Sequence, residues 1–413
     1  MSNIKKPPSN SKEVYKSESG FSTYRFVVAG LAVAIVFSQA MSFLSVSPLV
    51  PLIIEEYKIS HFMAGLLSSI TILSHVAFAI PASMLIGRFG IKMVIVFGCL
   101  LSLTSTLSFL AESFLILLFL RLLFGLGASL IIPAIAPLFM QWFSPKEFPL
   151  VNGMVVAAFS LGIAFTNFIV VPISEVVGWK GSLSVLGIPT LLSTIVWIIF
   201  GKTRTEFVET GNHISFTGVW KVLKSRNSVL LGIADAGPYS LYVVALAWLP
   251  AFYHQVHGIS LETAGRLTGI ISLAGLVSLI LAGLLSTRFV KRRPFFIFPG
   301  ILIGFSGMST FLFADASMIM MVLALISLGF ASFFYVPSLL TVPMELPQVS
   351  PSQVSVTIAV IMTLGGISAF LAPLIVGVLT DLTGDYVPGL LIFSVLSWSL
   401  AVAGYFLPET GKK

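Results

Sequence analysis

Residues 57–66 read YKISHFMAGL, and residues 257–266 read HGISLETAGR. The two stretches share Ile-Ser and, four residues further on, Ala-Gly, at a separation of 200 residues. The similarity extends beyond them, because Arg88 is followed by phenylalanine and so is Arg288. Two related halves in one apolar chain are typical of membrane proteins whose halves move relative to each other around a central site.

The composition is that of a chain solvated largely by lipid. Apolar residues make up 57% of it and charged residues 9%, whereas soluble domains carry about 25% charged residues. A membrane-spanning helix needs about 20 apolar residues. The chain has twelve such runs, at 26–54, 62–86, 94–111, 115–141, 148–174, 181–201, 227–254, 262–286, 294–313, 317–343, 352–378 and 386–407.

We therefore predict an all-α membrane protein with twelve transmembrane helices in two pseudo-symmetric six-helix bundles. The predicted divisions are an N-terminal tail, a first bundle, a linker, a second bundle and a C-terminal tail, at 1–25, 26–201, 202–226, 227–407 and 408–413. Neither the first tail nor the linker is long enough to bury a core of its own, so an independent soluble catalytic domain is not expected.

The distribution of basic residues predicts the orientation. With both termini on the cytoplasmic side, the tails and cytoplasmic loops hold 19 of the 23 Lys and Arg residues, and the opposite loops hold three. Arg121 lies inside a span. This positive-inside bias predicts a multi-pass protein of the plasma (inner) membrane with cytoplasmic termini. Because the basic residues are spread over short loops, the net charge of +7 does not indicate nucleic-acid binding.

Several short motifs accompany this organisation. Positions 83–92 read SMLIGRFGIK, and the equivalent positions 283–292 read GLLSTRFVKR. Positions 121–127 read RLLFGLG, 377–384 read GVLTDLTG, and 408–410 read PET. Over nearly the whole chain, this pattern resembles the major facilitator superfamily, whose loop between the second and third spans typically reads G-x-x-x-D-R-x-G-R-[RK].

The resemblance implies gating loops that contain Arg88, Gly90, Lys92, Arg288, Lys291 and Arg292. Both loops lack the Asp of the family motif, which in the family is thought to help hold the cytoplasmic side closed. Residues 248–250, which read Trp-Leu-Pro, look most like the cyanate/nitroimidazole branch and nearby carriers of small anions.

Two ionisable residues deep in spans are candidates for function, since a charge in hydrocarbon costs about 2.5–3.5 kcal/mol on insertion scales. Arg121 could hold an anion through two parallel hydrogen bonds, or it could bind oxygens that hold the first and fourth spans together. Asp235 could carry a coupling proton, because desolvation favours its neutral form, or it could lie near cytoplasmic water at a helix start. Their depths differ by roughly 20 Å, so no salt bridge between them is expected.

Polar residues near the middle of other spans complete the expected site. His75 is a second candidate for proton coupling, with a hydrogen bond to a neighbouring helix as the alternative. The remaining side chains could contact a small substrate or simply join helices. They are Gln39, Asn167, Tyr239, Tyr242 and Tyr335.

No enzyme signature appears, and no cofactor or metal site is expected. There is no P-loop for nucleotide phosphates, and Cys99 is the sole cysteine. The resemblance implies a monomeric secondary transporter that moves a small organic or inorganic anion with a proton by alternating access. The alternatives are a drug–proton antiporter and a non-transporting membrane receptor or scaffold.

Overall fold

The computed structural model describes residues 22–144, 147–204, 225–288, 291–314, 317–346 and 351–410, and these are helical apart from short connections. The first half contains α1 Tyr24–Phe43, η1 Ser47–Leu49, α2 Val50–Tyr57, α3 His61–Ser102, η2 Leu103–Leu110, α4 Phe114–Trp142 and α5 Phe148–Phe200. The second contains α7 Arg226–Gln255, α8 Leu261–Arg288, α9 Pro294–Leu312, α10 Met318–Phe334, α11 Val336–Glu345, α12 Pro351–Thr383, α13 Val387–Leu396 and α14 Ser399–Phe406.

Two of these helices each contain two membrane spans. The backbone turns at Gly90 in α3 and at Gly178 in α5, where φ is 78° and 73°. A positive φ is accessible to glycine because it has no Cβ. Eleven described helices are long and apolar enough to cross a membrane, and one of them, Leu150–Phe200, contains Gly178. Divided there, the described residues form the twelve expected spans, and the predicted fold class is confirmed.

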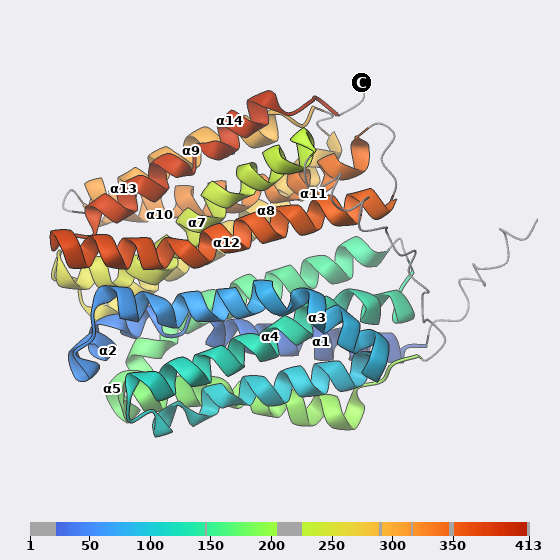
Figure 1. Cartoon of the computed structure of the whole chain (residues 1–413), viewed down its shortest axis with the longest axis horizontal. Helices are drawn as coiled ribbons and strands as arrows, with labels where there is room; N and C mark the ends of the chain where they lie inside the picture. The colour runs from blue at the N-terminus through green and yellow to red at the C-terminus, as the bar shows by residue number, and fades with distance from the viewer. Residues whose placement is uncertain are drawn as a thin grey trace, which may run out of the picture.

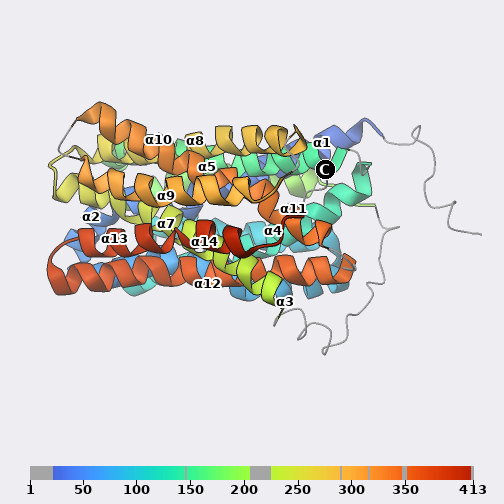
Figure 2. The same ribbon diagram turned by 90° about the horizontal axis from the view of Figure 1, so that it is seen from above.

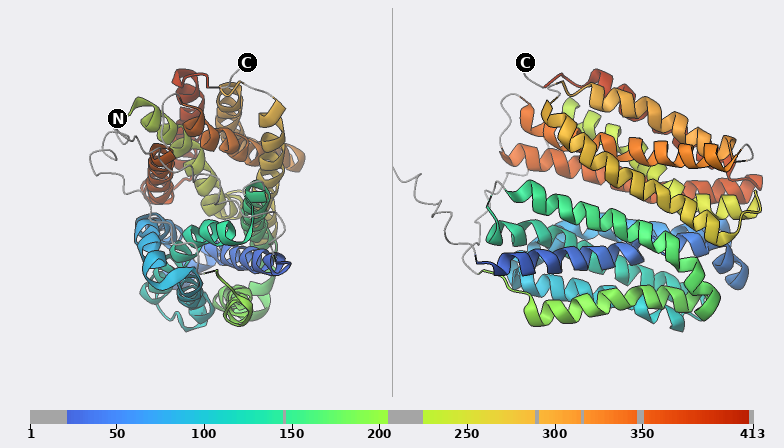
Figure 3. Two further views of the ribbon diagram at one scale, coloured as in Figure 1. Left: turned by 90° about the vertical axis from the view of Figure 1, so that its right-hand side faces the viewer. Right: turned by 180° about the vertical axis from the view of Figure 1, so that it is seen from behind.

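The spans form two bundles that lie side by side (Figures 1 and 3). The first bundle runs from α1 to α5, and the second from α7 to α14. Tyr24 donates a hydrogen bond to the carbonyl of Phe200 at 2.6 Å, so the start of the first span and the end of the sixth meet. The start of α7 and the end of α14 lie at this same end of the molecule (Figure 1). We call it the termini end.

Some helix boundaries follow from residue chemistry. Ser60, Ser113, Ser225 and Ser317 each accept a hydrogen bond from a backbone N–H in the first turn of the following helix, as serine does at N-caps. The first span is interrupted at 44–46, just before Pro48, and the tenth is interrupted at Tyr335, just before Pro337. Proline lacks the N–H that would continue the helical bonding.

A single apolar core joins the two bundles at the end opposite the termini, which we call the sealed end. There Phe43 and Ala64 of the first bundle share a core with Trp248, Phe252 and Tyr386 of the second. Hydrogen bonds between the bundles lie nearer this end as well, at His61 and Phe62 with Asp381 and at Asn167 with Thr268.

Toward the termini end each bundle packs on itself. One core contains residues of the first bundle only, from Val28 to Trp197, and another contains residues of the second bundle only, from Leu231 to Leu407. Figures 1 and 2 show the helices running lengthwise between the two ends, and in Figure 1 α3 and α12 lie close at the sealed end and diverge toward the other. Among the described residues, the core shared by the bundles therefore lies at the sealed end, and the cores toward the termini end each belong to one bundle.

Candidate functional site

Arg121, on α4, binds the backbone of two other helices of the first bundle. Its guanidinium donates to the carbonyl of Ser42 at 2.6 Å, to that of Phe43, and to that of Leu67 at 3.4 Å. Because α1 ends at Phe43, its last carbonyls have no partner within the helix. A cation is also favoured at a helix C-terminus. Arg121 therefore caps α1 and ties it to α3 and α4.

The charge of Arg121 is buried and has no carboxylate partner among the described residues. The residue is 4% exposed, and its guanidinium also lies 5.3 Å from the ring centroid of Phe124. Backbone carbonyls are dipoles, so they stabilise the cation without cancelling its net charge. The first bundle thus holds a positive charge that no described carboxylate neutralises. The guanidinium N–H groups themselves donate to backbone carbonyls.

Gln39 lies one helical turn before Phe43 on the same face of α1. The residue is 3% exposed, and among the described residues neither its amide nitrogen nor its amide oxygen has a hydrogen-bond partner. An unsatisfied buried polar group costs about 1–3 kcal/mol. Its neighbour Ser38, by contrast, bonds the carbonyl of Ile35 at 2.8 Å. Gln39 is therefore a buried side chain with both donor and acceptor capacity unused.

Asp235, on α7, is the central polar residue of the second bundle. Tyr335 donates its hydroxyl to Oδ1 at 2.9 Å. A Cβ at Gly365 on α12 would lie 2.3 Å from Oδ2 and 3.6 Å from the ring of Tyr239. In the part of the chain that the structure describes, Asp235 has no cationic partner. Sequence reasoning named Asp235, Tyr239 and Tyr335 separately, and the structure brings them together.

Two other expected site residues are engaged in helix contacts. Tyr242 lies 3.1 Å from the hydroxyl of Ser272 and packs edge-on against Phe333. Asn167 donates to the carbonyl of Ile163 at 2.9 Å and accepts from Thr268 of the other bundle at 3.3 Å. Asn167 therefore links the fifth and eighth spans across the bundle interface.

The two predicted gating loops differ in their contacts. In the first, Arg88 stacks on Phe89, Gly90 supplies the positive φ of the turn, and the Lys92 carbonyl accepts from Trp197. In the second, Arg292 donates to Glu345 at 2.6 Å, which raises the pKa of the guanidinium. Lys291 is exposed. The side chains of Arg288 and of the proton-coupling candidate His75 lie outside the described residues.

Sequence reasoning missed a contact at the sealed end, which we call the Asp381 latch. The carboxylate of Asp381, on α12, accepts from the backbone N–H of His61 at 2.8 Å and of Phe62 at 2.9 Å. It also lies 2.8 Å from Nδ1 of His61. His61 begins α3, so Asp381 caps that helix, and an anion is favoured at a helix N-terminus. The imidazole packs against the rings of Trp248 and Tyr386.

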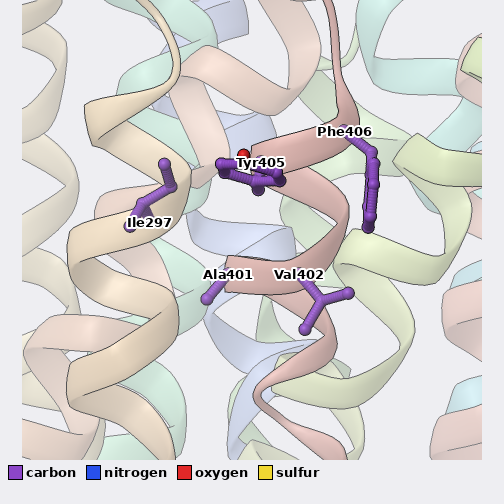
Figure 4. Close-up of a pocket in the computed structure, with 5 residues that line it drawn as sticks. All are labelled: Ile297, Ala401, Val402, Tyr405 and Phe406. Carbon is purple, nitrogen blue, oxygen red and sulfur yellow. The ribbon is translucent and has the colours of Figure 1, made fainter.

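A pocket on the outside of the second bundle has a different character. It lies between α9 and α14 and contains no charged residue (Figure 4). Val402, Tyr405 and Phe406 are strongly exposed there, as expected for a surface that faces lipid. The lining residues are Ile297, Ala401, Val402, Tyr405 and Phe406. None of the candidate site residues belongs to it.

Comparison with known proteins identifies the class. The sequence profile of the Major Facilitator Superfamily matches residues 31–373, and the chain belongs to this family. It is a multi-pass transporter, with a small-molecule substrate and a lipid environment. The predicted family is confirmed, as is the prediction that the chain is not an enzyme.

Named relatives and solved structures agree with this class. The probable sulfoacetate transporter SauU of Cupriavidus necator is 27% identical, with 93% of this chain and 94% of the relative covered. The probable galactarate/D-glucarate transporter GudP of Bacillus subtilis is 24% identical, with 79% of each covered. A bacterial homolog of the human lysosomal transporter Spinster, solved in an inward-facing and unoccupied conformation, has a TM-score of 0.72 at 16% identity, covering 94% of this chain and 95% of that one. It shares the fold.

The capping role of Arg121 predicts a loss of stability on substitution. Arg121→Gln leaves up to three buried carbonyls without their donor, at about 1–3 kcal/mol each, and Arg121→Lys retains the charge but loses the planar fork. We expect both variants to melt earlier than the wild type in detergent, with the glutamine variant lower. Unchanged melting temperatures together with lost substrate binding would show that the residue acts on substrate alone.

The Asp381 latch predicts that Asp381→Asn opens the sealed end more often, because the amide has one acceptor oxygen and no charge for the helix N-terminus. The reporter is a cysteine at Ala64, which is buried in the shared core, in a Cys99→Ala background. Its labelling by a membrane-impermeant maleimide should rise several-fold. Asp385→Asn, in the exposed loop that follows, is the control. Equal labelling in both variants would contradict the latch.

Proposed function

We propose that this transporter moves a small organic anion together with a proton. The observation that carries the proposal is the buried charge of Arg121, which has no carboxylate partner among the described residues. An unneutralised cation makes the site between the bundles favourable for an anion. The names of two relatives support this substrate class, since sulfoacetate and galactarate or glucarate are small organic anions.

Asp235 is the proton carrier in this proposal. A carboxylate and an anionic substrate within the same partly desolvated site repel each other more strongly than they would in water. Protonation of Asp235 removes that repulsion, so anion and proton are favoured together. The neutral acid is also the form that a partly buried carboxyl adopts at least cost. Release of the proton then favours release of the anion.

The bundle arrangement supports transport by alternating access at the plasma membrane. With the basic loops on the cytoplasmic side, the termini end would be cytoplasmic and the sealed end external, which is the arrangement expected of an inward-facing state. The two bundles would rock about the central site, exposing it to each side in turn. The divisions at 26–201 and 227–407 are the moving units, and each monomer contains a complete pathway.

The role of Asp235 is tested by Asp235→Asn in proteoliposomes, with labelled sulfoacetate as the probe. An amide cannot carry the proton, so accumulation driven by an inward pH gradient should be abolished. Exchange of internal for external anion, which needs no net proton movement, should persist. Asp385→Asn is the control, because that carboxyl lies in an exposed loop.

Two results would count against this proposal. Proton-driven accumulation that survives Asp235→Asn would remove Asp235 as the carrier. Transport of amphipathic drugs outward with protons moving inward, and no transport of anions, would favour the antiporter alternative.

Gln39 provides an independent test of substrate contact. Gln39→Leu removes two unsatisfied buried polar atoms while keeping a similar volume, so the melting temperature should rise. If the amide binds the anion, the KM for sulfoacetate should rise as well, because stability and function trade off at such positions. Ser69→Ala is the control, because it removes a buried hydroxyl that has no partner among the described residues. It should raise the melting temperature without changing the KM. An unchanged KM in Gln39→Leu would refute the substrate contact.

A further inference from the structure

Tyr335 occupies the interruption of the tenth span. It lies between α10, which ends at Phe334, and α11, which begins at Val336 (Figures 1 and 2). Pro337 cannot donate to the carbonyl of Phe333, as a regular helix would require. The span therefore consists of two arms, and α11 is the arm at the termini end. Tyr335 is the residue at the junction of the arms.

The ring of Tyr335 is fixed while its hydroxyl reaches a neighbouring helix. The residue is 2% exposed and belongs to the core of the second bundle near the termini end, with Leu231 and Ala234 of α7 and Leu339 of α11. Its hydroxyl donates to Asp235 on α7 at 2.9 Å. One polar contact thus joins the junction of the tenth span to the carboxylate on the seventh.

The surroundings of the carboxylate leave it little freedom. Gly365 on α12 is the close neighbour of Oδ2, and any larger residue there would place a Cβ at 2.3 Å from it. Among the described residues, the titratable groups that face Asp235 are Tyr335 and, on its own helix, Tyr239. Neither is charged near neutral pH. The Tyr335 hydroxyl is therefore the donor seen to act on the charged form of Asp235.

We infer that Tyr335 is a positioning residue that holds the charged form of Asp235 and links its protonation to the inner arm of the tenth span. This inference rests on the proposed role of Asp235 as the proton carrier. A hydrogen bond to a carboxylate is shorter and about twice as strong as one between neutral groups. Loss of the proton therefore tightens the link between α7 and the junction, and gain of the proton loosens it.

The link has a direction in the transport cycle. For the termini end to close, α11 and the neighbouring helix ends of the second bundle must approach the first bundle. With Asp235 charged, the strong bond between Tyr335 and Asp235 holds the junction against α7. Protonation weakens the bond and frees α11 to move. The protonated, substrate-bound carrier can then leave the inward-open state more readily than the deprotonated one.

The test is the pH dependence of sulfoacetate uptake by Tyr335→Phe in proteoliposomes. Phenylalanine keeps the ring and its packing but removes the donor that stabilises the carboxylate. Asp235 should then hold its proton to higher pH, so the pH of half-maximal uptake should rise by about one unit, a tenfold change in protonation equilibrium. A role confined to packing would not move this pH.

Matched variants make the result decisive. Tyr253→Phe is the control, because this buried tyrosine loses a hydroxyl that donates to the backbone carbonyl of Thr310, at 2.8 Å, and not to a carboxylate. Its pH profile should match the wild type. Gly365→Ala should raise the half-maximal pH as Tyr335→Phe does, because the added Cβ displaces the carboxylate from the tyrosine. It serves as the second variant if Tyr335→Phe assembles poorly.

Three outcomes overturn the inference. An unshifted pH profile in Tyr335→Phe or in Gly365→Ala, with accumulation abolished in Asp235→Asn, rejects the role of Tyr335 and leaves Asp235 as the proton carrier. An equal shift in Tyr253→Phe assigns the effect to any lost buried hydroxyl. Accumulation that persists in Asp235→Asn rejects the proposed function and the inference together.

Discussion

Lipid offers no hydrogen bonds, so every backbone group within the membrane must find a partner in the protein. The interruption of the first span at 44–46 breaks this rule locally, and Arg121 restores it by donating to the carbonyls of Ser42 and Phe43. Only a side chain with several donors in a fixed plane can serve several carbonyls at once. The cost is a buried charge, and that charge is what makes an anionic substrate a reasonable occupant of the neighbouring space.

The same rule operates at both ends of the helices. At the sealed end, Asp381 accepts from the first N–H groups of α3, so its carboxylate satisfies backbone donors of the opposite bundle. At the termini end, Glu345 accepts from the guanidinium of Arg292 and Glu409 accepts from the backbone N–H of Arg292, all within the second bundle. A bond between bundles resists their separation, whereas a bond within one bundle does not. The described polar contacts and the shared apolar core therefore both join the bundles at the sealed end.

Much of the fold could be predicted from sequence because apolar runs and internal repeats are properties of composition and spacing. The long helix α5, which turns at Gly178, still matches two predicted spans, because the glycine does not disturb the pattern of apolar residues. The contacts of the candidate site were harder to predict than the fold. The position of a residue along a helix follows from counting residues, and both Arg121 and Asp235 lie in helices long and apolar enough to cross a membrane. The rotation of each helix does not follow from counting. The contact of Tyr335 with Asp235 depends on that rotation, and the acceptors of Arg121 are backbone carbonyls, which every residue carries and no sequence motif marks.

The absence of the motif Asp from residues 83–92 and 283–292 acquires a physical meaning beside the Asp381 latch. A carboxylate placed on a helix N-terminus of the opposite bundle stabilises whichever end of the molecule it spans. This chain has such a carboxylate at the sealed end, and both predicted gating loops lack the one that the family motif provides. In a two-state carrier, a latch at one end stabilises the state that is closed at that end. A ligand can favour closure of the termini end only by its difference in affinity between the two states.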